Sequence, residues 1–238
     1  MNAFDFSILS FLNRFEDQCP SFDKALLSLS AASAFCKAGL IVALYWWAWF
    51  KNGEDHNKNK DVREIIISAM LACVAAVIVI RLAVLAFPFR VRPLADPTNG
   101  LHFPQESFIN WHNWSSFPSD HAIMFFTLTI PLFFISRVLG WIALLDSVFL
   151  VCLPRVFLGI HYPTDVLAGA AIGVGIGLLA NQKNIKGVIS KRAFQFMEKH
   201  PGLFYAGFFL FTCQVANMFS DSVSVGSIII NHLKKLLH

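Results

Sequence analysis

The first apolar residues of the chain recur at the spacing of one helical face. They lie at positions i, i+4, i+7, i+8 and i+11, namely Phe4, Ile8, Phe11, Leu12 and Phe15. Charged residues occupy other positions of this segment, and Pro20 is expected to end it. An amphipathic helix of this kind is typical of a segment that lies along the interface of a membrane. We therefore expect an N-terminal interfacial helix.

Six further stretches are predominantly apolar. They cover residues 25–50, 65–87, 121–135, 141–153, 166–180 and 203–219. A helix needs about 20 residues to cross the hydrocarbon core of a bilayer. The pattern therefore predicts an all-α integral membrane bundle of six transmembrane helices with the N-terminal interfacial helix, built as one domain over residues 1–238. The other segments are expected to be loops or turns at 51–63, 88–118, 136–140 and 181–202, with an amphipathic piece at 228–237.

The composition excludes several other classes of protein. Apolar residues make up 56% of the chain and charged residues 14%, whereas soluble domains average about 25% charged residues. Five scattered cysteines without a CxxC pair argue against a disulfide framework or a zinc site. The net charge of +4 is too small for a typical nucleic-acid-binding protein. We expect the membrane as a partner, and no nucleic acid, metal or cofactor.

Lysine and arginine are distributed unequally between the two sides of the predicted bundle. The loops after the first, third and fifth spans hold ten of them, and the opposite side holds seven. Because cytoplasmic loops of membrane proteins carry the excess of positive charge, the side with ten is expected to be cytoplasmic. Both termini and residues 88–118 would then lie outside.

Three separated segments place reactive side chains at helix ends on that outer side. They are residues 90–93 (Arg-Val-Arg-Pro), residues 118–121 (Pro-Ser-Asp-His), and residues 155–165, which hold Arg155, His161 and Asp165. Arginine binds phosphate oxygens through paired hydrogen bonds. A helix that starts at Ser119 directs free backbone N–H groups towards an anion. The pattern therefore predicts a phosphate site.

Two histidines complete this group. Together they can supply a nucleophile and a general acid, the minimum for a two-step phosphoryl transfer through a covalent intermediate. Asp165 lies four residues after His161, close enough to accept an imidazole N–H and to fix the tautomer that leaves the other nitrogen free. No metal is needed for this chemistry, because arginines and backbone N–H groups can neutralise the developing charge.

The three segments resemble, in this order, the signature motifs of the type 2 phosphatidic acid phosphatase (PAP2) superfamily. The motifs read Arg-x-Arg-Pro, Pro-Ser-Asp-His and Arg-x5-His-x3-Asp, and they lie within residues 81–169. The middle motif is more often Pro-Ser-Gly-His in the family. The form with Asp, between Phe117 and Ala122, is similar to the branch of bacterial undecaprenyl-diphosphate phosphatases.

The resemblance implies a role for each residue by its position in the motifs. His161 would be the nucleophile that forms a phosphohistidine, Asp165 would orient it, and His121 would be the general acid and then the base. The residues implied in binding the phosphoryl oxygens are Arg92, Arg155 and Ser119, with Arg90 as a helper and Asp120 beside them.

The sequence departs from the family pattern at three positions. Leu85 stands where the first motif usually has Lys, and either Arg81 or Arg90 could replace that Lys. Pro154 replaces the Ser that usually precedes the third motif, and we expect it to end the fourth span. Asp120 replaces a Gly, and we expect it to orient an arginine or to stand at the helix start, where an acid is favourable.

Simpler structural interpretations exist for some of these polar residues. Asp165 and Ser119 are also ordinary residues for the start of a helix. Arg81 and Asp146 are expected at similar depth within their spans and to pair, because an unpaired charge there is costly. Four side chains between the second and third spans are expected to form an interfacial belt, namely His102, Trp111, His112 and Trp114.

The resemblance predicts hydrolysis of undecaprenyl diphosphate to the monophosphate at the outer face of a bacterial plasma membrane. This reaction would recycle the carrier lipid for envelope synthesis. A phosphatidylglycerophosphate or phosphatidate phosphatase and a lipid phosphotransferase are alternatives with the same chemistry. A non-catalytic transporter or lipid-binding protein is a more distant alternative, since a transporter should show inverted repeats and helices broken near the midplane.

Overall fold

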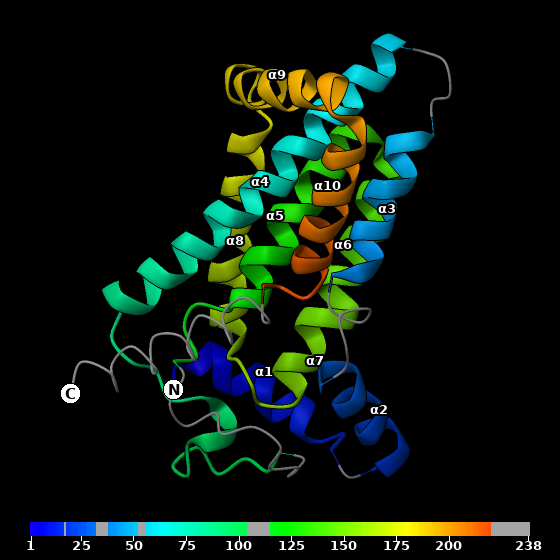
Figure 1. Ribbon diagram of the computed structural model, residues 1–238. Helices are drawn as coiled ribbons and strands as arrows, with labels where there is room; N and C mark the ends of the chain where they lie inside the picture. Colours follow the sequence, from blue (N-terminus) through cyan, green and yellow to red (C-terminus); the bar gives the residue numbers. More distant parts are fainter. Residues whose placement is uncertain (17, 32–37, 52–55, 104–114, 220–238) are drawn as a thin grey trace, which may run out of the picture.

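The computed structural model describes residues 1–16, 18–31, 38–51, 56–103 and 115–219, and the regular elements within these ranges are helices (Figure 1). The α-helices are α1 (Ala3–Asn13), α2 (Pro20–Ala31), α3 (Gly39–Phe50), α4 (His56–Ala86), α5 (Asp120–Ile135), α6 (Arg137–Leu145), α7 (Leu153–Phe157), α8 (Pro163–Ala180), α9 (Lys183–Lys199) and α10 (Pro201–Ala216). The described residues also form a 3-10 turn, η2 (Pro93–Ala95), and a π-helical segment, η4 (Asp146–Cys152). The all-α prediction is confirmed for these residues. The predicted piece at 228–237 and three belt residues (Trp111, His112 and Trp114) lie outside them.

The long helices run side by side around α5 (Figure 1). α5 packs against α8, α4 and α6, and α3 and α10 cover α4 on another side. α9 crosses one end of this bundle. α1, α2, α7 and the segment that follows α4 lie at the opposite end, which we call the α1 end. The start of both α5 and α8 lies at the α1 end, and this arrangement positions the site.

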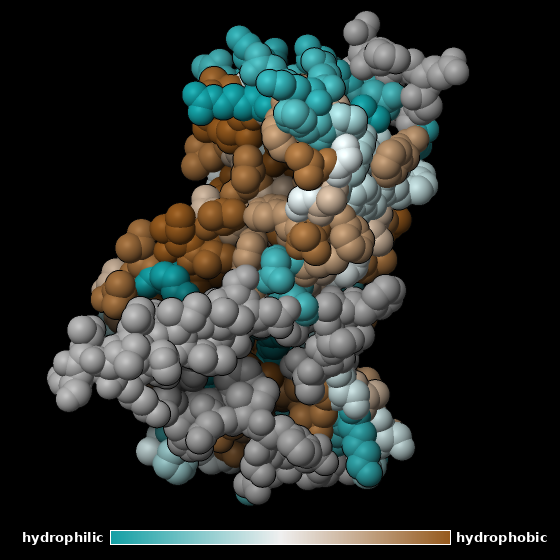
Figure 2. Space-filling model, viewed as in Figure 1, coloured by the Kyte–Doolittle hydropathy of each residue, from teal (hydrophilic) through white to brown (hydrophobic). Residues whose placement is uncertain are grey.

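Three helical stretches are long and apolar enough to cross a membrane. They are Asn59–Ala86, Arg137–Phe157 and Pro163–Ala180, whereas α3, α5 and α10 are apolar but only 12, 16 and 16 residues long. Figure 2 shows apolar side chains over α4 and α8 and hydrophilic side chains over α9. The protein therefore has the surface of a multi-pass membrane protein. The count of six spans and the interfacial position of α1 stay predictions.

The predicted first span, residues 25–50, is not one helix. α2 ends at Ala31 and packs against α7 at the α1 end, and only α3 joins the bundle. Pro20 begins α2 rather than closing the preceding helix, since proline fits the first turn, where its missing N–H costs nothing. α2 also carries Asp23 and Lys24, which suit it to the end of the bundle better than to its interior.

The loop predicted at residues 181–202 is wrong, because 183–199 form α9. Its basic residues suggested a loop, yet apolar side chains recur along one side of the helix. Ile189, Phe194 and Met197 pack against the main core, and the lysines remain exposed or half-buried on the other side. α4 likewise begins at His56, inside the loop predicted at 51–63.

The fourth predicted span also differs from the structure at both of its ends. The turn predicted at 136–140 is shorter, since α6 begins at Arg137. Pro154 does not end the span, because α6, η4 and α7 follow one another without a break from Arg137 to Phe157. A proline within a helix lacks its N–H and clashes with the carbonyl four residues earlier. The wider π-helical turns of η4, immediately before α7, accommodate Pro154 without breaking the helix.

Small residues allow α8 to lie directly against α5. A Cβ atom built on Gly169 would stand 2.6 Å from the backbone oxygen of Ser119, and one on Gly177 would stand 2.9 Å from Cβ of Ile130. Gly173, between them, has equally little room against α5. Any larger side chain at these positions would push the two helices apart. The close approach matters for the site because α5 and α8 each carry one of its motifs at their first turn.

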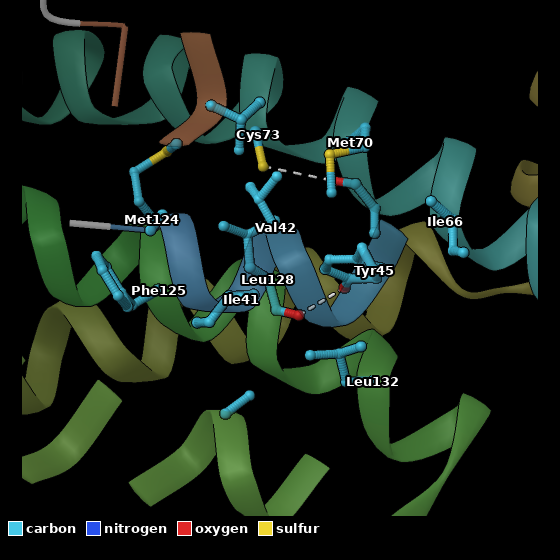
Figure 3. Close-up of a cluster of buried hydrophobic side chains, with 14 of the residues drawn as sticks. Ile41, Val42, Tyr45, Ile66, Met70, Cys73, Met124, Phe125, Leu128 and Leu132 are labelled. Atoms are coloured by element: carbon cyan, nitrogen blue, oxygen red, sulfur yellow. Dashed lines mark hydrogen bonds between the residues drawn. The ribbon is translucent and has the colours of Figure 1, made fainter. Parts of the chain in front are cut away.

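The largest cluster of buried apolar side chains joins α3, α4 and α5 (Figure 3). Tyr45 of α3 lies within this cluster, and its hydroxyl donates a hydrogen bond of 2.6 Å to the carbonyl oxygen of Leu128 in α5. Trp49 and Phe125 are also completely buried there. This apolar core fixes α5 within the bundle and leaves its polar first turn at the α1 end.

Candidate functional site

The three motifs meet where α5 and α8 begin. The backbone N–H of Ser119 donates to the carbonyl oxygen of Asp165 at 3.1 Å, which joins the second motif to the third. Arg90 of the first motif donates to the Asp165 carboxylate and, at 2.9 Å, to the hydroxyl of Thr164. The carbonyl oxygen of Arg90 accepts the N–H of Ser116 at 2.8 Å. Segments far apart in the sequence thus form one polar cluster.

A tight turn after α7 holds His161 in this cluster. The N–H groups of Ile160 and His161 both donate to the carbonyl oxygen of Arg155, at 2.9 and 3.2 Å. Gly159 has φ +66°, a conformation that costs little for glycine but not for residues with a Cβ atom. Its carbonyl accepts the N–H of Leu94 at 2.9 Å, so the turn is tied to the segment that follows the first motif.

Replacing Gly159 by alanine is expected to destabilise this turn. The added Cβ would stand 2.6 Å from the Phe103 ring, and the left-handed conformation costs about 1–2 kcal/mol for an alanine. Gly159→Ala should therefore lower the melting temperature in detergent. Gly175→Ala is the matched control, because no atom lies within 4 Å of a Cβ built there, and it should melt at or slightly above the wild-type temperature. Equal melting of the two variants would contradict the assignment of strain to this turn.

The imidazole of His161 is fixed in one tautomer. Its Nδ1 lies 2.8 Å from the carbonyl oxygen of Ser116, an atom that can only accept, so Nδ1 carries the proton and Nε2 does not. Nε2 lies 3.4 Å from Nη1 of Arg92 and 3.8 Å from Oδ1 of Asp120. Burial, with a further contribution from the charge of Arg92, lowers the pKa of His161 to about 3. The imidazole is therefore neutral at pH 7 and keeps an unprotonated nitrogen facing Arg92.

Asp165 does not accept the imidazole N–H that its spacing predicted. Its Oδ2 lies 3.9 Å from Nδ1 of His161, too far for a hydrogen bond. The carboxylate instead accepts the hydroxyl of Ser116, the backbone N–H of Tyr162 at 2.9 Å, and Arg90. Ser116 therefore stands between the two residues, with its hydroxyl on Asp165 and its carbonyl on His161. A carboxylate at the first turn of α8 also suits the helix dipole, as the simpler interpretation expected.

His121 faces the same site from the first turn of α5. Oδ1 of Asp120 lies 2.8 Å from Nδ1 of His121 and accepts the His121 backbone N–H at the same distance. The His121 side chain is 18% exposed, compared with 2% for His161, so it has access to solvent. Because a carboxylate has no hydrogen to donate to a phosphate oxygen, the geometry favours Asp120 as a residue that orients His121. Of the two expectations for Asp120, its position at the helix start is confirmed, because it is the first residue of α5, and its carboxylate contacts a histidine where an arginine was the alternative.

Two of the three predicted arginines are buried within the cluster. Arg92 is 5% exposed and its Nη1 donates to the carbonyl of Ile160 at 2.9 Å. Burial lowers the pKa of Arg92, while the charges of Asp120 and Asp165 oppose this shift. Arg155 is 7% exposed, donates to the carbonyl of Val151 at 3.1 Å, and is acted on by the charges of Asp120 and Arg92. Buried guanidinium groups beside an unprotonated imidazole nitrogen form an environment for an anion.

Arg90 forms its side-chain hydrogen bonds with residues of α1 and α8 and not with the histidines. Its guanidinium donates to Asp165, Thr164 and, at 2.7 Å, Asp5 of α1, and its central carbon lies 3.9 Å from the centre of the Tyr162 ring. These contacts fit a structural role better than the predicted phosphate contact. Ser119, which is fully buried, accepts the N–H of Ala122 and caps α5, in agreement with its simpler interpretation.

The position of the missing lysine does not face the site. Leu85 is 83% exposed on α4, and Arg81, one turn earlier, is exposed as well. Arg81 therefore does not replace the lysine. It also does not form the predicted ion pair among the described residues, since Asp146 is buried and its Oδ2 has no hydrogen-bond partner.

Sequence reasoning did not identify Ser116, Thr164 or Asp5 as part of this cluster. Ser116 acts through its carbonyl as well as its hydroxyl, and a backbone contact leaves no sequence signal. Asp5 did leave a sequence signal, because it is an acidic residue at the start of a mainly apolar helix, three residues after the capping residue Asn2.

Comparison with known proteins confirms the family resemblance. Residues 86–186 match the PAP2 superfamily. The chain is 45% identical over 60 residues to the bacitracin transport permease protein BcrC of Bacillus licheniformis, a stretch that covers 25% of this chain and 29% of that protein. It is 28% identical over 121 residues to the undecaprenyl-diphosphatase BcrC of Bacillus subtilis, covering 51% and 58%.

A third relative is matched over a longer stretch. The chain is 25% identical over 178 residues to the putative undecaprenyl-diphosphatase YbjG of Escherichia coli, covering 74% of this chain and 80% of that protein. The matches to the two BcrC proteins span less than two thirds of their length. No solved structure matches the chain. The matched family segment contains the three motifs, from Arg90 to Asp165.

Proposed function

We propose that this chain, whose residues 86–186 match the PAP2 superfamily, is a membrane phosphatase that hydrolyses undecaprenyl diphosphate to undecaprenyl phosphate through a phosphohistidine. The observation that carries the proposal is the fixed tautomer of His161, whose unprotonated Nε2 faces Arg92 while Nδ1 donates to Ser116. An imidazole nitrogen that is both unprotonated and directed into a cationic cluster is suited to attack a phosphorus atom.

The first step transfers the terminal phosphoryl group to the enzyme. Nε2 of His161 attacks the terminal phosphorus, an N–P bond forms, and the bond from that phosphorus to the bridging oxygen breaks. A protonated His121 donates its Nε2 proton to the departing lipid monophosphate. Its Nδ1–H remains hydrogen-bonded to Asp120. Arg92 and Arg155 stabilise the charge on the transferred oxygens. The carbonyl of Ser116 stabilises the positive charge that develops on the His161 ring.

The second step releases phosphate and restores the enzyme. The now neutral His121 takes a proton from water, the water oxygen attacks the phosphorus, and the N–P bond breaks. Inorganic phosphate leaves, and His161 regains its free Nε2. The buried arginines supply the positive charge that many phosphatases take from metal ions, so we propose that the reaction requires no metal.

The relatives and the position of the site support the lipid substrate. One of the relatives described above is named undecaprenyl-diphosphatase, and another is named putative undecaprenyl-diphosphatase. The cluster lies at one end of an apolar helical bundle, where a headgroup could reach it while the prenyl chain stays in the bilayer. We propose that this end faces the outside of a bacterial plasma membrane and that the reaction recycles the carrier lipid for envelope synthesis.

Purified protein in detergent should release phosphate from undecaprenyl diphosphate in the presence of EDTA. Phosphatidate and phosphatidylglycerophosphate, tested in parallel, should react at least about tenfold more slowly, which corresponds to about 1.4 kcal/mol of transition-state binding. Faster release from either phospholipid than from undecaprenyl diphosphate would identify that phospholipid as the preferred substrate. Transfer of the phosphoryl group to an added lipid in preference to water would identify a phosphotransferase. Absence of release from all three lipids would favour a non-catalytic protein, such as the transporter that the name of one relative indicates.

A further inference from the structure

α1 contacts the site through one buried acidic side chain. α1 packs against α8 and α7, and Leu9 is buried there with Val156 and Tyr162. Phe4, Phe6 and Phe11, by contrast, are about half exposed on the other side of the helix. Asp5 lies on the inward side and is 0% exposed. A helix held only by apolar contacts would not need to bury a carboxylate, which is costly unless the carboxylate is paired.

The Asp5 carboxylate is fully paired with residues of the first and third motifs. Oδ1 accepts the backbone N–H of Thr164 at 2.9 Å, and Oδ2 accepts the Thr164 hydroxyl at 2.8 Å. Oδ2 also accepts Nη2 of Arg90 at 2.7 Å. Asp5 therefore caps the first turn of α8 from outside and holds Arg90 at the same time.

Arg90 links the Asp5 carboxylate to the His161 ring. Its guanidinium lies between the carboxylates of Asp5 and Asp165 and packs on the Tyr162 ring. Asp165 in turn accepts the hydroxyl of Ser116, whose carbonyl fixes Nδ1 of His161. A continuous chain of hydrogen bonds thus runs from α1 to the imidazole.

Because this inference rests on the proposed function, it deepens that function rather than adding a separate one. We propose that Asp5 is a positioning residue for the phosphoryl-transfer reaction. Asp5 holds Arg90 and Thr164 so that Asp165 and Ser116 keep the His161 ring in the attacking orientation. The N-terminal helix is then part of the active-site architecture and not only a membrane-surface segment.

Asp5→Asn tests this role, since asparagine has nearly the same volume but presents a donor in place of one carboxylate oxygen. The contact with Arg90 should be lost while the apolar packing of α1 remains. We expect kcat for undecaprenyl diphosphate to fall about 10- to 100-fold, because a misplaced reacting group costs this much. KM should change less than about twofold, because Arg92 and Arg155, which bind the phosphate, are untouched. Ser7→Ala, in an exposed part of the same helix, is the control and should behave as wild type.

A double variant tests whether Asp5 acts through Arg90. Arg90→Lys keeps the charge but cannot bridge two carboxylates as a guanidinium does. If the chain of contacts is correct, Asp5→Asn combined with Arg90→Lys should lose little more kcat than the more damaging single change. A loss equal to the product of the two single losses would overturn the proposed route.

The outcomes separate this inference from the proposed function. An active wild type together with an unchanged kcat for Asp5→Asn would overturn the role of Asp5 alone. A lower melting temperature with unchanged kcat, or an effect on KM only, would do the same, because it would indicate a purely structural contact. If Asp5→Asn does not fold, Arg90→Lys gives the same distinction between kcat and KM. A wild type that releases no phosphate from undecaprenyl diphosphate would overturn both proposals.

Discussion

Replacing His161 by alanine is expected to abolish phosphate release, with a loss on the order of 10⁴-fold or more, as is typical when a nucleophile is removed. The reason is that, among the residues that the structure describes, no other group is placed to form the covalent bond. Nε2 of His161 faces Arg92, whereas the other imidazole, His121, is held against Asp120 and is more exposed. The measurement is phosphate release from undecaprenyl diphosphate by the purified variant in detergent.

His200→Ala is the matched control for this change. His200 is exposed between α9 and α10, at the end of the bundle opposite to the site, so this variant should keep wild-type activity. The melting temperature of His161→Ala should be measured alongside, so that a loss of activity is assigned to a folded protein. Release by a folded His161→Ala variant at close to the wild-type rate would show that His161 is not the nucleophile.

Replacing His121 by alanine should give the second-largest effect, a loss of about 10²–10⁴-fold in steady-state turnover of the lipid diphosphate, the range typical for a general acid or base. The loss should depend on the leaving group. p-Nitrophenol is acidic enough to leave without a proton donor, so p-nitrophenyl phosphate should still phosphorylate His161 in the variant. The following hydrolysis, which needs His121 as a base, should be slow.

Pre-steady-state kinetics of His121→Ala with p-nitrophenyl phosphate would reveal this difference. The expected result is a burst of about one equivalent of p-nitrophenol followed by slow turnover, the kinetic fingerprint of an accumulating covalent intermediate. If the first turnover were instead slowed by the same factor for both substrates, His121 would contribute to binding or structure and not to proton transfer.

The motifs were visible in the sequence because their chemistry resides in side chains at helix ends. The structure brings Nη1 of Arg92 to 3.4 Å from Nε2 of His161, and Arg92 and Arg155 act electrostatically on each other. The close packing of α8 on α5 is likewise predictable from Gly169, Gly173 and Gly177, which lie four residues apart, whereas Gly175 has open space around it.

Contacts made by the backbone could not be predicted in the same way. The spacing of Asp165 and His161 is compatible with a direct hydrogen bond, yet the carbonyl of Ser116 accepts the imidazole N–H, and the Asp165 carboxylate lies 3.9 Å away. A carbonyl has the same chemistry in every residue, so the sequence does not indicate which one will be used. Asp5 was missed for a different reason, since its side chain is visible in the sequence but a single acidic residue in the first turn of a helix is common.

Helix boundaries were hardest to predict where polar and apolar residues alternate. α9 is rich in lysine and was interpreted as a loop, although its apolar side packs on the core. The stretch 25–50 is apolar enough for one span, but the structure divides it between α2 and α3. Hydropathy reports how apolar a segment is, and it does not report whether the segment continues in one direction.

The most direct test of the central claim is to trap the phosphoenzyme. Wild-type protein should be mixed with undecaprenyl diphosphate labelled in the terminal phosphoryl group, quenched in base within the first turnover, and the labelled residue identified. A phosphohistidine is stable in base and labile in acid, and the label should be on His161 and absent from His161→Ala. Label on another residue, or turnover without any labelled protein at the earliest times, would contradict the mechanism.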